Sequence, residues 1–269
     1  MASRSDIIVA ALGECAEMSG ESASRTSLEI PDAQQDLLKA LVKTGKPVVL
    51  LLFTGRPLVL NWEDANVHSI LNVWFGGSET GDAVADVLFG KITPSGKLTT
   101  TFPRSVGQLP LFYNHLNTGR PDPDSHIFNR YASNYLDESN EPLYPFGYGL
   151  SYTDFVYGEL QISSETLPKN GELTVSVTVT NKGNYDGYET VQLYLRDIYA
   201  EVARPMKELK GFERIFLKSG ESRDVKFVIT KDDLKFYNSE LHYVYEPGEF
   251  DVMVGPNSRD VQTKSFQAE

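Results

Sequence analysis

Cysteine is nearly absent from this sequence, since Cys15 is the one cysteine among 269 residues. A single cysteine forms no disulfide within the chain and cannot build a cysteine-ligated zinc site. Histidine is also rare, and the four histidines are scattered without the close spacing of a metal-binding pair. The sequence therefore predicts no metal site.

Long apolar runs and an excess of basic residues are lacking as well. The apolar runs fall far short of the roughly 18 residues that a membrane-spanning helix needs. Lysine and arginine number 25 against 37 aspartates and glutamates, which gives a net charge of −12. Nucleic acids and anionic membranes both attract basic surfaces, so neither is expected as a partner.

Two glycine-containing segments resemble catalytic motifs only superficially. Residues 76–81 lack the Gly-Lys-Ser/Thr ending of a P-loop and do not match the dinucleotide fingerprint, so they predict a tight strand-to-helix turn. Residues 149–152 do not have the spacing of a nucleophile elbow. Because the histidines are scattered, a Ser-His-Asp triad is also not expected, and any acid/base chemistry is left to carboxylates.

The first 115 residues alternate between predicted strands and predicted helices. Apolar runs predict buried parallel strands over residues 7–13, 48–53 and 70–75. A capping-box variant at Asp32 and apolar positions at helical spacing over residues 37–42 predict a helix that Gly45 ends. A second helix is predicted with residues 83–88 as its apolar face, and a short helical stretch is expected near residues 62–66. This order predicts right-handed βαβ units in an α/β parallel sheet layer. Because so few strands make a thin sheet, we expect a partial α/β sandwich domain whose first strands precede this chain.

The character of the sequence changes twice after residue 115. Residues 116–152 are rich in Asn, Asp, Pro, Ser and Tyr without a sustained period, which predicts a linker, and its aromatic residues predict that it packs on the domain surface. Residues 153–269 contain about seven short segments of alternating hydrophobicity separated by turn signals. They predict an all-β sandwich of immunoglobulin or fibronectin type III kind.

The loop after the first predicted strand carries Glu14, Glu17 and Glu21 together with Arg25. In open α/β sheets, ligands collect beyond the carboxyl ends of the strands. A glutamate there, partly shielded by a neighbouring domain, could have a raised pKa and act as a general acid. We expect Glu21 to be this general acid. The alternative is that Glu21 is an ordinary solvated charge.

Four segments together resemble glycoside hydrolase family 3, and the resemblance runs through essentially the whole chain. Residues 94–103 (PSGKLTTTFP) and 143–152 (LYPFGYGLSY) resemble motifs of that family. Residues 204–212 (RPMKELKGF) resemble the fibronectin type III-like module that follows in the same enzymes. Residues 115–121 (HLNTGRP) resemble a segment of the periplasmic bacterial β-glucosidases, one branch of that family.

The resemblance implies a retaining hydrolase with an Asp nucleophile on a (β/α)8 barrel and a Glu general acid/base on the α/β domain. Residues 19–22 are similar to the segment that carries the acid/base, so the resemblance gives this role to Glu21. Glu17 is second, because the length of this loop varies in the family. No cofactor is implied, since two carboxylates suffice for the reaction.

Three further residues are expected near the substrate. Trp74, beyond another strand end, could form an apolar wall for a sugar ring, with core packing as the alternative. Asn117 and Arg120 could hydrogen-bond sugar hydroxyls at the pocket mouth, with a solvated loop as the alternative.

The sequence also departs from the family pattern, because it contains no barrel and therefore no nucleophile. We expect the C-terminal part of an exo-acting β-glucosidase that removes terminal non-reducing β-D-glucosyl residues from a β-glucoside or oligosaccharide. The isolated chain is expected to be inactive without the N-terminal barrel portion. The resemblance further implies a periplasmic or secreted location and permits a homodimer. The alternative function is a non-catalytic carbohydrate-binding or structural module.

Overall fold

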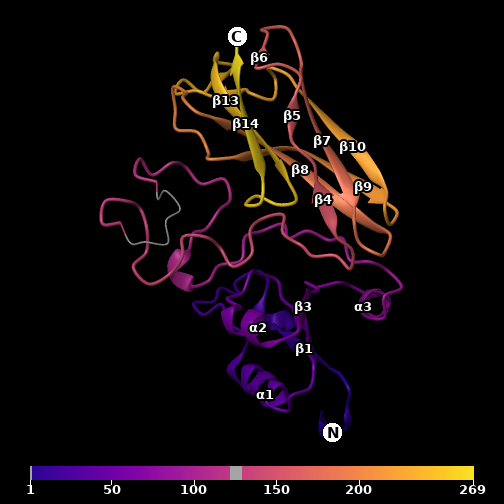
Figure 1. The fold of residues 1–269 in the computed structure, drawn as a ribbon. Coiled ribbons are helices and arrows are strands. Elements are labelled where there is room, and N and C mark those ends of the chain that lie inside the picture. Colours follow the sequence, from indigo (N-terminus) through magenta and orange to yellow (C-terminus); the bar gives the residue numbers. More distant parts are fainter. Residues whose placement is uncertain (1, 122–128) are drawn as a thin grey trace. The chain divides into compact units, whose positions relative to one another are not determined.

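The computed structural model describes residues 2–121 and 129–269, and the chain forms two compact units (Figure 1). Unit 1 contains residues 1–92, 101–111 and 138–144, and unit 2 contains residues 93–100, 112–137 and 145–269. The boundaries 1–115, 116–152 and 153–269 stay predictions, and residues 122–128 of the middle range lie outside the described residues. Among the residues described, no helix combines the length and apolar character needed to cross a membrane.

Unit 1 is built around a three-stranded parallel sheet in the order β1 (Ile8–Gly13), β2 (Val48–Phe53) and β3 (Ser69–Asn72). Ile8 pairs with Val48, and Val49 pairs with Ser69. The apolar runs form these strands because both faces of a parallel sheet are normally buried. The predicted parallel α/β sheet is therefore confirmed.

The third strand is shorter than predicted. It ends at Asn72, and Trp74 has a φ of 56°, in the left-handed region that non-glycine residues rarely adopt. The prediction of a strand over residues 70–75 is therefore wrong for its last three residues, because the backbone turns out of the sheet before Trp74.

Three helices accompany this sheet: α1 (Asp32–Val42), α2 (Asn61–Asn66) and α3 (Thr80–Leu88). Short 3-10 helices lie at Ala2–Arg4, Ala16–Met18 and Val106–Gln108. Leu38 of α1 is fully buried, as expected for the apolar face of an amphipathic helix. On β1, however, Ile8 and Ala10 are buried while Val9 is 51% exposed, so one face of this edge strand is uncovered.

Unit 2 contains an all-β sandwich, which confirms the predicted fibronectin type III-like architecture. One sheet has the order β10-β7-β4 with β5 on β7, the other has the order β6-β14-β13-β8-β9, and β11 and β12 form a separate hairpin. The strands are β4 (Phe155–Tyr157), β5 (Gln161–Ile162), β6 (Thr166–Leu167), β7 (Leu173–Asn181), β8 (Gly187–Asp197), β9 (Glu208–Leu217), β10 (Ser222–Ile229), β11 (Phe236–Tyr237), β12 (Tyr243–Val244), β13 (Gly248–Gly255) and β14 (Gln262–Ala268).

The core of the sandwich is formed by every second residue of its strands. Val175, Val177 and Val179 of β7 are buried, and so are Val191 and Leu193 of β8. Alternate residues of a strand point to opposite faces, so these side chains meet between the two sheets.

Candidate active-site loop

The residues that follow β1 form a loop that presents Glu21 at an exposed turn. The chain passes through the 3-10 helix Ala16–Met18, and the backbone N–H of Ala23 then donates to Gly20 O at 3.2 Å. Gly20 has a φ of 135° and Ser22 a φ of 59°, so residues on both sides of Glu21 adopt positive φ. This backbone turns sharply at Glu21 and leaves its side chain in solvent.

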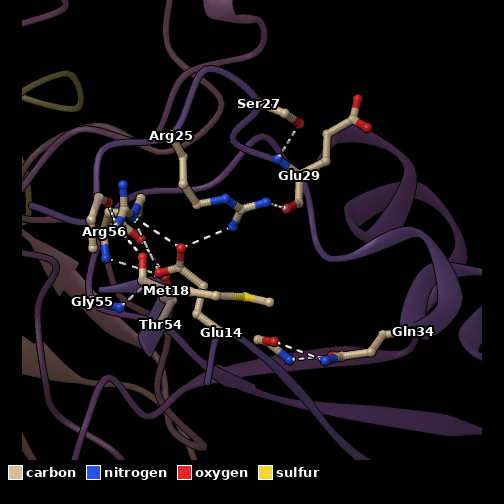
Figure 2. A network of polar contacts seen from close by, with 11 residues as sticks. Glu14, Met18, Arg25, Ser27, Glu29, Gln34, Thr54, Gly55 and Arg56 are labelled. Atoms are coloured by element: carbon tan, nitrogen blue, oxygen red, sulfur yellow. Dashed lines mark hydrogen bonds and ion pairs between the residues drawn. The ribbon is translucent and has the colours of Figure 1, made fainter. Parts of the chain in front are cut away.

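Glu14, the first carboxylate of the loop, is buried and lies in a network of polar contacts (Figure 2). It forms ion pairs with Arg25 at 2.9 Å and with Arg56 at 3.0 Å. Thr54 Oγ1 donates to Glu14 Oε2 at 2.9 Å, and the backbone N–H of Gly55 donates to the same oxygen at 3.2 Å. Glu14 thus connects the carboxyl end of β1 to that of β2.

These contacts determine the protonation of Glu14. Burial alone raises its pKa, but hydrogen bonds from Arg25, Thr54 and Gly55 and the charge of Arg56 together lower it below the ordinary value. Glu14 is therefore a structural anion, which is unsuited to donating a proton at neutral pH.

Glu17 also differs from a general acid. It is fully exposed, and its pKa is lowered by a hydrogen bond from its own backbone N–H and by one with the Cys15 side chain. A general acid works best when its pKa lies near the operating pH, and that usually requires a raised carboxyl pKa. Glu21 is the third loop carboxylate, and it is exposed without the arginine partners of Glu14 or the local hydrogen bonds of Glu17.

Arg56, three residues beyond β2, holds the base of the loop. Its Nη2 atom donates to Met18 O and, at 2.8 Å, to Ala23 O (Figure 2). The Arg56 side chain is 19% exposed. One guanidinium group therefore joins the two ends of the segment that carries Glu21.

Gly55 allows the loop to approach β2 closely. A Cβ atom at this position would lie 1.9 Å from Ser19 Oγ and 2.9 Å from Phe75 Cε2. Phe75, which follows Trp74, therefore lies beside the loop, whereas the Trp74 ring packs 5.9 Å from the ring of Phe102. Trp74 is half-buried in this aromatic contact, and its role toward a sugar stays a prediction.

Asn117 and Arg120 belong to unit 2 and are exposed. Within unit 2, the backbone N–H of Gly119 donates to Asn117 Oδ1 at 3.0 Å, and that of Ser133 donates to Arg120 O at 2.8 Å. That Asn117 and Arg120 hydrogen-bond sugar hydroxyls stays a prediction.

Among the residues that the structure describes, neither a metal cluster nor the cavity beside α3 includes a predicted site residue, although Val73, which precedes Trp74, lines that cavity. Within residues 2–121 and 129–269, no group of three or more His, Cys, Asp or Glu side chains could hold a metal ion. A cavity of about 290 Å³ lies at the end of β3 beside α3, and it is lined by Leu71, Asn72, Val73, Gly76, Glu79, Thr80, Ala83, Val84 and Val87.

Sequence reasoning missed Arg56 and the structural role of Glu14. By sequence, Arg56 is only part of the segment that closes β2. The signal that could have found both residues is the pairing of two parallel strands, because their carboxyl ends lie at the same edge of a sheet and bring the following residues together.

Comparisons with known proteins agree with this architecture. Residues 1–152 match the glycosyl hydrolase family 3 C-terminal domain, and residues 189–258 match the fibronectin type III-like domain. The chain is 51% identical over 267 residues to a periplasmic beta-glucosidase of Salmonella typhimurium, covering 99% of this chain and 35% of that protein. It is 44% identical over 267 residues to a beta-xylosidase of Formosa agariphila, covering 98% of this chain and 36% of that protein.

A solved structure shows the same fold. The beta-glucosidase of Listeria innocua in complex with glucose superimposes with a TM-score of 0.92 at 44% identity, covering 98% of this chain and 37% of that one. The chain thus spans about a third of the length of these relatives. It belongs to glycoside hydrolase family 3, of which it contains the C-terminal portion.

Proposed function

We propose that this chain supplies the general acid/base of a retaining, exo-acting β-glucosidase, and that Glu21 is this residue. The observation that carries the proposal is the contrast among the three loop carboxylates. Glu14 is a buried anion paired with two arginines, the pKa of Glu17 is lowered, and Glu21 stands exposed at the turn beyond β1. A retaining glycosidase needs one carboxyl group that acts as the general acid/base and one nucleophilic carboxylate about 5–5.5 Å away.

The proposed roles divide the reaction between this chain and a preceding portion of the same enzyme. Glu21 would protonate the glycosidic oxygen while a carboxylate of the N-terminal portion attacks the anomeric carbon. Glu21 would then remove a proton from the water that hydrolyses the glycosyl-enzyme intermediate. Two observations support such a division: the chain spans about a third of the length of its relatives, and one face of β1 is uncovered.

A terminal β-D-glucosyl residue is the proposed substrate, supported by the beta-glucosidases of Salmonella typhimurium and Listeria innocua. Trp74, Asn117 and Arg120 are proposed to contact it. A periplasmic location is supported by the name of the Salmonella protein, and a homodimer stays a prediction from the family resemblance.

The test is a chimera in which this chain replaces the matching region of the Salmonella periplasmic beta-glucosidase. For Glu21→Gln, kcat/KM should fall by roughly 10²–10⁴-fold on alkyl and phenyl β-glucosides and much less on 2,4-dinitrophenyl β-glucoside, whose leaving group needs no proton. For Glu21→Ala, azide should restore turnover of the activated substrate, because the azide anion attacks the glycosyl-enzyme intermediate in place of water, releases the nucleophilic carboxylate as a glycosyl azide forms, and needs no general base. Glu17→Gln is the matched control, and its kinetics should stay close to the parent chimera.

The alternative, a non-catalytic carbohydrate-binding or structural module, predicts that Glu21→Gln leaves the dependence on leaving group unchanged. The isolated chain provides a second test, because without a nucleophile it should not turn over aryl β-glucosides. Turnover by the isolated chain that disappears in Glu21→Gln would contradict the proposed division of labour.

A further inference from the structure

We infer that Arg56 is a positioning residue for Glu21, an inference that rests on the proposed acid/base function. Arg56 lies outside the loop in sequence, and it reaches the loop from the carboxyl end of β2. Its guanidinium group donates to two loop carbonyls and pairs with Glu14 at the same time. Each of these contacts restricts where the turn around Glu21 can lie.

The two carbonyls bracket the turn. Met18 O and Ala23 O, which accept from the same Nη2 atom, flank a segment of four residues, 19–22, that contains Glu21. Glu17 lies outside this bracket. Arg56 therefore ties together the two ends of the short segment that presents Glu21 and does not enclose the other exposed carboxylate.

The guanidinium group is itself fixed from the opposite side. Its Nε atom lies 3.0 Å from Glu14 Oε1 and 3.3 Å from Oε2. Glu14 is held in turn by Arg25, Thr54 and the Gly55 N–H. A planar guanidinium with donors on both Nε and Nη2 can serve the carboxylate and the carbonyls together, whereas a lysine ammonium on its flexible stem cannot reproduce that fork.

Glu21 depends on this restraint because its own side chain makes no hydrogen bond with any residue that the structure describes. Its direction is set by the backbone, and that backbone contains Ser22 at a positive φ of 59°. Strained backbone of this kind persists when the surrounding structure enforces it. Small displacements of a catalytic group cost on the order of 10²-fold in rate.

The experiment uses the same chimera with Arg56→Lys and Arg56→Met. Arg56→Lys keeps a cation beside Glu14 and removes the fork, so it tests positioning with the smaller risk to folding. The matched control is Arg25→Met, which removes the other arginine from Glu14 without touching Met18 O or Ala23 O. The readout is kcat/KM across aryl β-glucosides with leaving groups of different pKa, measured for each variant in the parent chimera and again in the Glu21→Gln background.

If Arg56 positions the acid, Arg56→Lys should lower kcat/KM by roughly 10–100-fold on phenyl β-glucoside and little on the 2,4-dinitrophenyl substrate. Adding Arg56→Lys to Glu21→Gln should then cause almost no further loss, because the group being positioned is gone. Arg25→Met should keep the parent dependence on leaving group.

A purely structural role would lower kcat/KM equally on all substrates and would do so equally in the Glu21→Gln background. That outcome, with Glu21→Gln itself still sensitive to the leaving group, overturns the inference and leaves the proposed function standing. If Glu21→Gln shows no sensitivity to the leaving group, the proposed function fails, and the positioning role of Arg56 fails with it.

Discussion

Lys97 Nζ lies 3.1 Å from Glu189 Oε2, and both side chains are largely buried. Glu189 belongs to β8, and its other oxygen accepts a hydrogen bond from Tyr157 Oη at 2.8 Å. Lys97 also donates to Gly149 O at 3.2 Å. This ion pair fastens two of the segments that carry family motifs, around residues 97 and 149, to the sandwich of unit 2.

Replacing Lys97 should therefore destabilise unit 2. Lys97→Met would leave the Glu189 carboxylate buried without its cation, and removing one partner of a buried pair costs about 3 kcal/mol or more. Adding Glu189→Gln should recover much of this loss, because the amide oxygen still accepts from Tyr157. Urea unfolding of the chain with each variant measures the effect, and equal stability of Lys97→Met and the parent would contradict it.

A second prediction concerns Glu14. Glu14→Gln would leave Arg25 and Arg56 without their shared anion, and we expect a loss of roughly 3 kcal/mol at pH 7, measured by urea unfolding. Glu17→Gln, which removes an exposed charge from the same loop, is the control and should change the free energy of unfolding by less than about 0.5 kcal/mol.

The same pair of variants has a pH signature. Burial opposes ionisation of Glu14, but the hydrogen bonds from Arg25, Thr54 and Gly55 and the charge of Arg56 lower its pKa in the folded chain. Its contribution to stability is therefore present above the unfolded pKa and is lost as the pH falls through the lower folded pKa. The stability gap between parent and Glu14→Gln should narrow below about pH 4, and a gap that stays constant would count against this assignment.

The bounds of the strands could be predicted from the sequence only in part. The bounds of β2 match the apolar run 48–53, because a run with no polar residue has one plausible extent as a buried strand. The end of β3 was missed, because Val73, Trp74 and Phe75 are as apolar as the strand before them. The positive φ of 56° at Trp74 is a backbone conformation that the apolar pattern does not predict.

The candidate site, too, could be predicted from the sequence only in part. Glu14, Glu17 and Glu21 are the same residue type in one loop. The environment of Glu14 arises from Arg25 in that loop and from Thr54 and Arg56, about 40 positions away. The parallel pairing of β1 with β2 brings Thr54 and Arg56 to Glu14. The sequence predicts acid/base chemistry at this sheet edge and ranks Glu21 first, but the contacts that make Glu14 a buried ion-paired carboxylate are visible only in the fold.

Glu63 provides a prediction with the opposite pH dependence. It is buried in α2, and burial raises its pKa despite opposing contributions that include Gln35 and Lys39. A raised folded pKa stabilises the chain below the unfolded pKa, and this contribution is lost as the pH rises through the folded value. Glu63→Gln should therefore raise the melting temperature at about pH 8 and have little effect near pH 4. Asp36→Asn, an exposed change on α1, should show no such difference.

Asp197, at the end of β8, should titrate in an accessible range. Burial, with further contributions from Glu246 and Glu208, raises its pKa to about 6, while Arg204 and a Tyr199 backbone hydrogen bond act against the rise. The parent chain should lose stability between about pH 4 and pH 7 relative to Asp197→Asn, by about 1 kcal/mol once solvent screening is allowed for. Parallel stability curves for the two chains would show that Asp197 does not titrate there.

Gly55 yields a test of loop packing. In Gly55→Ala the new methyl group would collide with Ser19 Oγ and push the loop away from β2, so kcat/KM of the chimera should fall by roughly 10-fold or more. The double variant Gly55→Ala with Ser19→Gly removes the colliding side chain and should recover most of the activity. Failure of the second change to rescue the first would place the defect elsewhere, such as at Phe75.

The chain passes back and forth between its two compact units, leaving unit 1 after residue 92, returning at 101, leaving again after 111, and returning once more at 138. Neither unit is therefore a continuous stretch of sequence. A gene fusion or recombination event with its breakpoint anywhere between residues 93 and 144 would separate pieces that belong to one unit. Exchange of the sandwich strands alone, residues 155–268, would also divide unit 2, because residues 93–100 and 112–137 of that unit would stay behind.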